Sequence, residues 1–265
     1  MMLTTFDILA MLAVGLATGV LGGMVGLGGS VIMIPAMAVL FRTKPWADQH
    51  LFQATAMVMN VAVAVPAMLR HRRAGALRME LIRMMLAPTV IMILVGVVVS
   101  NQFAGEVLER LFAVFLVYVC AMLLRDIVRR RADKDPAGVI VTLPRAATVG
   151  GAMGFMGGLL GIGGGVVAVP LSQLLCRLPL RQAIAASSAV MGLTSAFGGA
   201  LKVATLPEHG RHPMEALVLA VMLCPTVVVG GYLGAGLTHR LPLAWVRGAL
   251  MVLLLAAAAK MGGVV

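Results

Sequence analysis

Residues 22–35 read GGMVGLGGSVIMIP, and residues 157–170 read GGLLGIGGGVVAVP. The two stretches are identical at seven of fourteen positions, which indicates that the chain contains two copies of one unit. Glycine destabilises a helix by roughly 1 kcal/mol relative to alanine, yet each stretch contains at least five glycines. Because both copies carry these destabilising glycines at the same place, we expect the backbone to depart from a regular helix at these positions.

The composition is typical of a membrane protein. Of the 265 residues, 61% are hydrophobic and 12% are charged, whereas soluble domains are about 25% charged. A helix needs roughly 20 apolar residues to cross a bilayer, and uncharged runs of that order follow one another along the whole chain. The sequence therefore predicts an all-α polytopic membrane protein with no sizeable soluble domain.

Ten apolar segments account for most of the chain, and we expect about eight to ten of them to be transmembrane helices. In the first half they lie near 5–25, 30–41, 51–69, 84–100 and 107–124, and in the second half near 146–161, 165–176, 183–201, 214–236 and 242–262. We therefore divide the chain into a first membrane repeat at 1–125, a basic cytoplasmic linker at 126–145 and a second membrane repeat at 146–265. Internal repeats of this kind are typical of secondary transporters, whose substrate site lies between the halves.

The relative orientation of the two repeats depends on how often each one crosses the membrane. Five crossings per repeat make the copies antiparallel, whereas counting the first two segments as one broken span makes them parallel. Basic residues concentrate in cytoplasmic loops; five arginines lie in 70–83, but the equivalent loop of the second repeat has only Lys202 and Arg211. We therefore favour two five-segment inverted repeats, with both termini outside and the 70–83 and 126–145 loops in the cytoplasm.

The net charge of +11 does not require a nucleic-acid partner. Many of the basic residues lie in two loops beside membrane segments, where topology and anionic lipid headgroups explain them. The three cysteines show no CxxC spacing, so we expect neither a metal nor a cofactor. All ten acidic residues lie in loops or at segment ends, which argues against a carboxylate-lined cation site inside the membrane.

The second segment of each repeat is too short to cross a bilayer. Its twelve residues would span about 18 Å as a helix, and the hydrocarbon core is about 30 Å thick. We expect a helix to unwind at each glycine cluster and to restart beyond it, so that free N–H groups and the positive end of the helix dipole bind an anion. The residues assigned to this site are Gly26, Gly28, Gly29, Ser30, Gly161, Gly163, Gly164 and Gly165.

Close helix packing is the other role that glycine has in membranes, because small residues let two helices approach each other. We assign this role to Gly15, Gly19, Gly154, Gly230 and Gly234. A nucleotide-binding loop is excluded, since no Lys-Ser or Lys-Thr pair follows either glycine cluster.

Polar side chains inside the segments are the remaining candidates for anion binding, because hydroxyls and amides donate hydrogen bonds without carrying a charge. Thr55 and Ser187 fall at equivalent positions of the two repeats. The other site candidates on these and neighbouring segments are Asn60, Gln173 and Ser188, with Ser172, Thr194 and Ser195 nearby. The alternative for each hydroxyl is a bond to a backbone carbonyl of its own helix.

Three further residues are assigned to the pathway or its gates, namely Gln53, Arg70 and Lys202. Arg70 and Lys202 each end the third segment of their repeat, where they would either attract an anion at opposite mouths or reach the lipid headgroups. The five histidines also lie at segment ends, and we expect none of them to couple transport to protons.

The doubled signature GxxxGxGGxxxxxP, at 22–35 and 157–170, resembles that of the sulfite exporter TauE/SafE family of membrane transporters. HRRAGALRMELIRMMLAP at 71–88 resembles the family's basic turn before its fourth helix, and 230–261 resembles its C-terminal end. The resemblance implies a secondary transporter in the bacterial plasma (inner) membrane that exports sulfite, sulfoacetate or a related organosulfonate by alternating access. One position departs from the doubled pattern, since Ser30 stands where the second copy has Gly165.

Other functions stay open beside this one. An anion channel would use the same donors, and the same architecture would also serve another small organic anion. An enzyme would need a nucleophile with a base, or a metal cluster, at membrane depth, and the sequence shows neither; we therefore expect no catalytic residue and no metal ligand. The expected partners are a small anionic substrate and membrane lipid, with a homodimer left open as the assembly.

Overall fold

The computed structural model describes residues 4–25, 29–73, 75, 77–129, 138–237 and 243–263. The helices of the first half are α1 (Thr5–Val25), α2 (Ser30–Leu40), α3 (Gln49–Arg73), α4 (Met79–Asn101) and α5 (Gly105–Arg129). Those of the second half are α6 (Leu143–Leu160), α7 (Gly165–Leu175), α8 (Leu180–Ala204), the 3₁₀-helix η2 (Leu206–His209), α9 (Pro213–Leu237) and α10 (Leu243–Met261). The described residues contain no strand, which confirms the predicted all-α fold.

Five helices of the described part are long and apolar enough to cross a bilayer. They are Thr5–Gly22, Met79–Asn101, Gly105–Arg125, Leu180–Ala204 and Pro213–Leu233. Large apolar side chains lie on their outer surfaces, where Val114 and Val221 are each 71% exposed. Exposed apolar surface of this kind marks a face that contacts lipid or another protein, and its presence on several long helices is that of a polytopic membrane protein.

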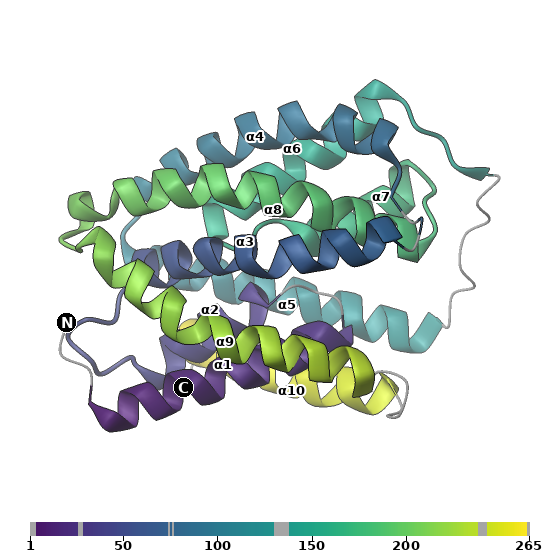
Figure 1. Ribbon diagram of the computed structural model, residues 1–265. Helices are drawn as coiled ribbons and strands as arrows, with labels where there is room; N and C mark the ends of the chain where they lie inside the picture. The colour runs from purple at the N-terminus through teal and green to yellow at the C-terminus, as the bar shows by residue number, and fades with distance from the viewer. Residues whose placement is uncertain are drawn as a thin grey trace.

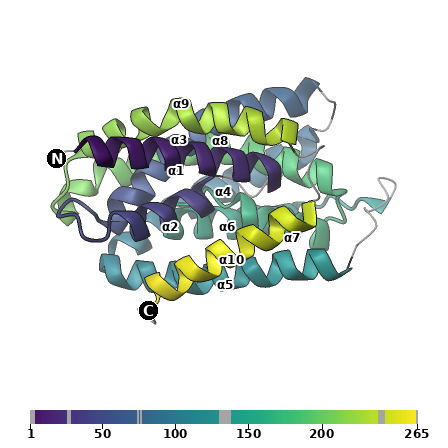
Figure 2. The same cartoon turned by 90° about the horizontal axis from the view of Figure 1, so that it is seen from below.

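The main helix pairs each contain one helix from the first half and one from the second half. α1 lies along α9 and α4 lies along α6, while α3 pairs with α8 and α5 with α10 (Figures 1 and 2). Exchanging the halves, so that α1 becomes α6 and α4 becomes α9, converts the first pair into the second and leaves the other two unchanged. The first helix of each repeat therefore packs against the fourth helix of the other, and α3 with α8 lies between these two pairs (Figure 1).

Glycines allow the close approach of the exchanged pairs. A Cβ atom on Gly19 of α1 would lie 2.3 Å from the carbonyl oxygen of Val227 in α9, and one on Gly154 of α6 would lie 2.3 Å from that of Thr89 in α4. Such distances leave no room for a side chain. Gly15 and Gly230 make equally close contacts, which is the packing that the spacing of these four glycines predicts. The surroundings of Gly234 lie outside the described residues.

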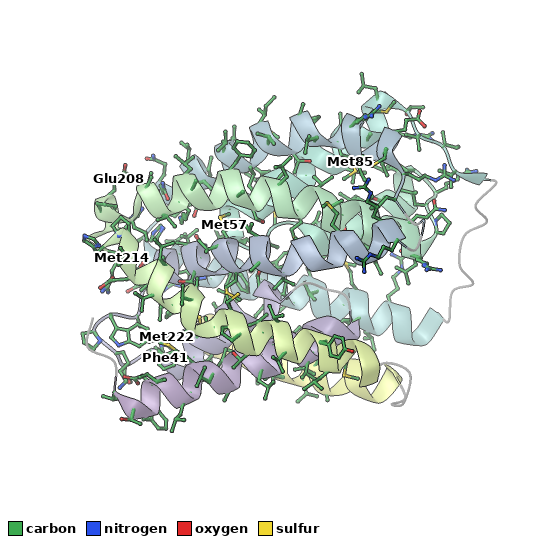
Figure 3. All side chains as sticks on the ribbon, in the orientation of Figure 1. Phe41, Met57, Met85, Glu208, Met214 and Met222 are labelled. Carbon is green, nitrogen blue, oxygen red and sulfur yellow. The ribbon has the colours of Figure 1, made fainter. Side chains whose placement is uncertain are left out.

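Methionine and aliphatic side chains fill the space between the helices. Met57 of α3 and Met85 of α4 are both fully buried, as Figure 3 shows among the surrounding side chains. Met57 packs with Ile93 and Val97 of α4. Unbranched methionine adapts to irregular gaps, so it suits a bundle whose helix spacing is set by glycines.

The linker between the repeats is only partly described. α5 extends to Arg129 and α6 begins at Leu143, and residues 130–137 of the predicted linker lie outside the described residues. The division of the chain into two repeats and a cytoplasmic linker, and the inverted orientation of the repeats, stay predictions.

Candidate functional site

The second glycine cluster interrupts the helix, as predicted. α6 ends at Leu160, and the backbone then passes through Gly161, Gly163 and Gly164 with φ angles of 75°, 67° and 74°. These left-handed conformations strain any residue that has a side chain and suit glycine. α7 begins directly afterwards at Gly165. The break therefore requires glycine at three positions of the repeated motif.

The first cluster also lies between two helices, but Gly29, the equivalent of Gly164, has a right-handed helical conformation with a φ angle of −66°. α1 ends at Val25, Gly29 is the N-cap of α2, and α2 begins at Ser30. Gly26 and Gly28 lie outside the described residues. A Cβ atom on Gly29 would lie 3.0 Å from Cγ2 of Thr18 in α1, so this position is also tightly enclosed.

The short helix after the second break folds back along the helix before it. A Cβ atom on Gly164 would lie 2.0 Å from the carbonyl oxygen of Met153, which is about two turns before the end of α6. α7 thus packs against α6, and α2 packs against α1. Since α2 and α7 have eleven residues each, they are about 17 Å long and begin well inside the bundle.

Both short helices start without a capping side chain. Their N-cap residues are Gly29 and Gly164, and glycine has no side chain that could accept a hydrogen bond from the first N–H groups. The first N–H groups of a helix have no acceptor within the helix, and they form the positive end of its dipole. Ser30 and Val166 beside these ends are 3% and 2% exposed, so the two helix starts are buried.

Asn60 of α3 connects the two breaks. Its Oδ1 accepts a hydrogen bond from the Ser30 hydroxyl at the start of α2. Its Nδ2 faces the other break, where a Cβ atom on Gly163 would lie only 2.7 Å from it. The structure therefore brings together Ser30, Asn60 and Gly163, three residues that the sequence assigns to the substrate site.

Two buried donors beside Gly163 have no hydrogen-bond partner among the described residues. They are Nδ2 of Asn60 and the hydroxyl of Ser195 in α8, which would lie 3.0 Å from a Cβ atom on Gly163. Asn60 is 3% exposed and Ser195 is fully buried. A buried polar group without a partner costs about 1–3 kcal/mol, so most native examples serve a ligand, a water or a function. These donors define the candidate site.

Other predicted site residues lie elsewhere or use their hydroxyl groups differently. The Thr55 hydroxyl donates to the carbonyl of Leu51 at 2.8 Å, and the Ser187 hydroxyl donates to that of Ile184 at 3.0 Å. Both hydroxyls thus follow the backbone-bonded alternative, because a carbonyl of the preceding turn is within reach. Gln173 and Ser188 are half-buried and take no part in the hydrogen bonds described here.

Gly165 is less constrained than the glycines before it. A Cβ atom there would meet only Sδ of Met191 at 3.5 Å, which is an ordinary contact. This explains how the first copy accommodates Ser30 at the equivalent position. The departure of Ser30 from the doubled pattern adds a hydroxyl to the site without disturbing the break.

Lys202 is buried in the bundle instead of reaching the lipid headgroups. Its side chain is 1% exposed, because α8 continues to Ala204 and η2 follows it directly. Its Nζ donates to Oγ of Ser100 at 2.8 Å and to Oδ1 of Asn101 at 2.8 Å, and lies 2.9 Å from Nδ1 of His50. The side chain of Arg70, its counterpart in the first repeat, lies outside the described residues.

Hydrogen bonds connect Lys202 to the second glycine break. The Ser100 hydroxyl donates to Oε1 of Gln53 at 3.0 Å, and Nε2 of Gln53 donates to the carbonyl of Leu159 at 3.2 Å. Gln53 also packs against Gly161, where a Cβ atom would lie 2.7 Å from its own Cβ. Gln53 is therefore part of the wall of the break, and its assignment to the pathway stays a prediction.

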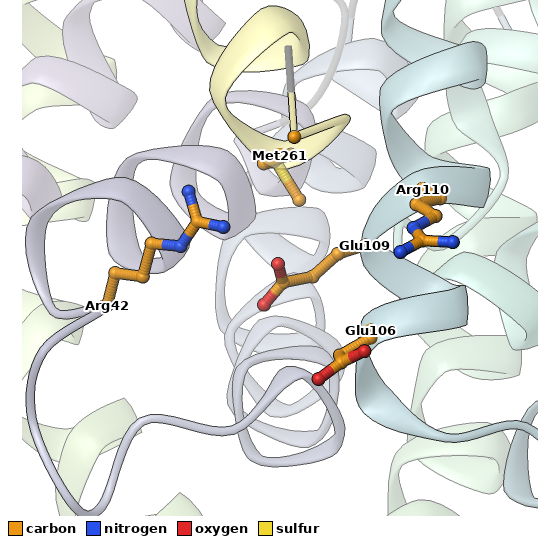
Figure 4. A pocket seen from close by; sticks show the side chains of 6 residues that line it. Arg42, Glu106, Glu109, Arg110 and Met261 are labelled. Atoms are coloured by element: carbon orange, nitrogen blue, oxygen red, sulfur yellow. The ribbon is translucent and has the colours of Figure 1, made fainter. Parts of the chain in front are cut away.

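A surface pocket of about 340 Å³ lies apart from these residues, where the start of α5 meets the end of α10. Figure 4 shows Arg42 facing Glu109 across it, with Met261 above. Its lining carries both signs of charge, from Arg42, Glu106, Glu109 and Arg110. Because no lining residue belongs to either glycine break, we do not assign the substrate to this pocket.

A bundle of apolar helices whose glycine clusters lie between short and long helices is the architecture of a polytopic membrane protein. The chain belongs to the sulfite exporter TauE/SafE family, whose model matches residues 11–261. This confirms the resemblance noted in the sequence and makes the chain an integral membrane protein. The family points to transport rather than to an enzymatic reaction.

Several curated proteins are similar to the chain. The "Probable membrane transporter protein MamO" of Magnetospirillum gryphiswaldense is 29% identical over 96% of this chain, but the chain spans only 45% of that protein. The "Probable membrane transporter protein YunE" of Bacillus subtilis is 26% identical over 89% of this chain and 90% of its own length. A "Probable membrane transporter protein" of Haemophilus influenzae is 27% identical over 97% of this chain and 98% of its own. No solved structure matches the chain.

Proposed function

We propose that the chain is a secondary transporter that exports a small sulfur-containing anion, such as sulfite or an organosulfonate, by alternating access. The observation behind this proposal is the pair of unpartnered buried donors, on Asn60 and Ser195, beside the glycine break at Gly163. The family description supplies the substrate class. The printed names of the relatives state transport without a substrate.

The chemistry of the site favours an anion over a cation. The free groups are an amide N–H and a hydroxyl, and the helix starts at Ser30 and Gly165 add backbone N–H groups. A sulfite or sulfonate group has three oxygens that accept hydrogen bonds from such donors. Neutral donors bind these oxygens without the cost of burying a fixed positive charge.

The inverted arrangement of the repeats is part of the proposal. The pairing of α1 with α9 and of α4 with α6 is unchanged when the halves are exchanged, as expected for two copies of one unit. The distribution of basic residues between equivalent loops favours the inverted orientation of these copies. In transporters built from inverted repeats, broken helices at the interface of the repeats bind the substrate. Asn60 lies at such an interface here, since it contacts Ser30 of the first break and Gly163 of the second.

The proposal is tested by counterflow of radiolabelled sulfite in liposomes that contain the purified protein. We expect saturable counterflow in the wild type and an apparent affinity about tenfold weaker in Ser195→Ala, since a hydrogen bond to a charged group contributes about 1.5–3 kcal/mol. The matched control is Thr194→Val, because that hydroxyl already donates to the carbonyl of Val190 in its own helix. Wild-type affinity in Ser195→Ala would remove Ser195 from the site.

The same preparation separates a transporter from an anion channel. A transporter that alternates between two states gives saturable counterflow and no unitary currents in planar bilayers. Sulfite-dependent unitary currents without counterflow would replace the proposal with a channel. Counterflow of carboxylates but not of sulfite or sulfoacetate would keep the transporter and change the substrate class.

A further inference from the structure

The ammonium group of Lys202 is buried without a negatively charged hydrogen-bond partner. Its three protons match the three acceptors around it, which are Oγ of Ser100, Oδ1 of Asn101 and Nδ1 of His50. All three acceptors are neutral. A buried cation whose hydrogen-bond partners are all neutral is expensive, even with the Asp48 carboxylate near enough to act on it, so a cation retained at this position calls for a functional explanation.

The contact with Phe103 places a hydrogen on Nε2 of His50. Its Nε2 lies 3.1 Å from the backbone carbonyl of Phe103, which only accepts, so Nε2 carries the hydrogen. Nδ1 is then the acceptor for Lys202 at 2.9 Å. A proton added to Nδ1 would remove this hydrogen bond and place two cations in contact. While this hydrogen bond is present, the pair of His50 and Lys202 carries one positive charge. If both side chains were protonated, the pair would carry two.

A second histidine covers the pair. The ring of His209 in η2 stacks on that of His50, with 3.6 Å between centroids, and its Nε2 is buried without a partner among the described residues. Burial lowers the pKa of His209, and the positive charge of Lys202 lowers it further. The carboxylates that act on this group of residues are Asp48, which precedes α3, and Glu208, labelled at this end of the bundle in Figure 3.

The pair also connects three helices of the bundle. Lys202 ends α8, His50 begins α3, and Ser100 and Asn101 end α4. From Ser100, hydrogen bonds continue through Gln53 to the carbonyl of Leu159, beside the glycine break. Lys202 thus holds the outer end of this chain through Ser100, and His50 helps to hold Lys202 in place.

We propose that His50 and Lys202 form the proton-binding site that couples anion transport to proton movement, an inference that rests on the proposed function. A proton from water binds Nδ1 of His50, the hydrogen bond from Lys202 breaks, and the two cations separate. Lys202, which also donates to Ser100, then shifts, so that the bond from Ser100 to Gln53 beside the break is no longer held in place. When the bond re-forms, the proton leaves Nδ1. This proposal replaces the expectation that histidines at segment ends have no such role.

The test measures accumulation of radiolabelled sulfoacetate in proteoliposomes at one external pH while the internal pH is varied. Both acid groups of sulfoacetate are ionised near neutral pH, so its charge is the same on both sides of the membrane. One coupled proton changes the equilibrium accumulation ratio about tenfold per pH unit. We expect this dependence in the wild type and in His212→Gln, an exposed histidine at the same end of the bundle. We expect His50→Gln to lose it, because glutamine can accept from Lys202 and donate to Phe103 but does not take up a proton.

A second measurement needs no transport. Burial and the positive charge of Lys202 lower the pKa of His50 in the folded protein to about 3, whereas His50 in the unfolded chain takes up a proton near pH 6.5. The thermal stability of the wild type in detergent should therefore fall as the pH falls below about 6.5. His50→Gln should lose less stability over that range, and His209→Gln shows how much of the fall comes from the stacked ring.

The outcomes distinguish this inference from the proposed function. Sulfoacetate counterflow with an accumulation ratio independent of the pH gradient would overturn the proton site and leave the transporter. Wild-type pH dependence in both His50→Gln and Lys202→Gln would place the coupling elsewhere. Absence of counterflow for sulfite and sulfoacetate would overturn the proposed function and the coupling with it.

Discussion

Asn60 and Gly163 show how single residues determine the candidate site. Asn60 accepts a hydrogen bond from Ser30 and faces Gly163 with a donor that has no partner among the described residues. The site therefore depends on a side chain at one position and on the lack of one at the other. Thr55 and Ser187, which repeat symmetry favours as a pair, donate instead to carbonyls of their own helices.

We expect Gly163→Ala to impair transport severely. The methyl group would lie 2.7 Å from Nδ2 of Asn60, and the φ angle of 67° disfavours any residue with a side chain by about 1–2 kcal/mol. Gly165→Ser is the matched control, because that position has room and Ser30 occupies its counterpart. Thermal unfolding and sulfite counterflow check both variants. Equal transport by the two would show that the break tolerates side chains and does not shape the site.

At the scale of whole helices, glycines allow the two repeats to pack closely against each other. The pairing of α1 with α9 and of α4 with α6 depends on backbone contact at glycines that lie in equivalent parts of the two repeats. Glycine has two separate roles in this chain as a consequence. It lets helices touch at Gly19 and Gly154, and it lets the backbone turn at Gly161, Gly163 and Gly164.

Gly154→Ala should destabilise the protein by about 1–3 kcal/mol, as overpacked core positions do. The added methyl would lie 2.3 Å from the carbonyl of Thr89, so α4 and α6 must separate. Gly151→Ala lies one turn away in the same helix and would meet only Cγ of Met92 at 3.7 Å, so it should have little effect. Thermal unfolding in detergent compares the two. A smaller loss for Gly154→Ala than for Gly151→Ala would contradict the packing role.

At the scale of the whole molecule, the open question is the orientation of the two repeats. Inverted repeats place the linker in the cytoplasm and the turn between α8 and α9 outside, whereas parallel repeats place both inside. The two arrangements assign opposite sides of the membrane to the end of the bundle that contains Lys202, His50 and His209. The orientation therefore decides from which side a proton reaches this pair.

Cysteine labelling in intact cells distinguishes the two orientations. In a background without Cys120, Cys176 and Cys224, we expect His212→Cys to react with a membrane-impermeant maleimide. Gly138→Cys, in the linker, should react only after the cells are opened; a methyl group at this position meets no atom within 4 Å, so the substitution should not disturb the fold. Protection of both positions in intact cells would support parallel repeats.

The sequence by itself determined the helical fold, the positions of the helices and the broken helix at the second glycine cluster. These properties are local: a run of apolar residues must form a helix in lipid to satisfy its backbone, and left-handed turns require glycine. Repetition of the motif added that both halves are built alike.

Only the tertiary structure decided which polar groups meet. His50 and Lys202 are 152 residues apart in the sequence, and Gln53 and Leu159 are 106 residues apart, so no local sequence pattern predicts either contact. Ser195 stands out only because its hydroxyl lacks a partner beside Gly163, whereas Thr194 next to it is bonded within its helix. Burial and hydrogen bonding depend on the three-dimensional surroundings of a side chain, and in this bundle those surroundings come from helices of both repeats.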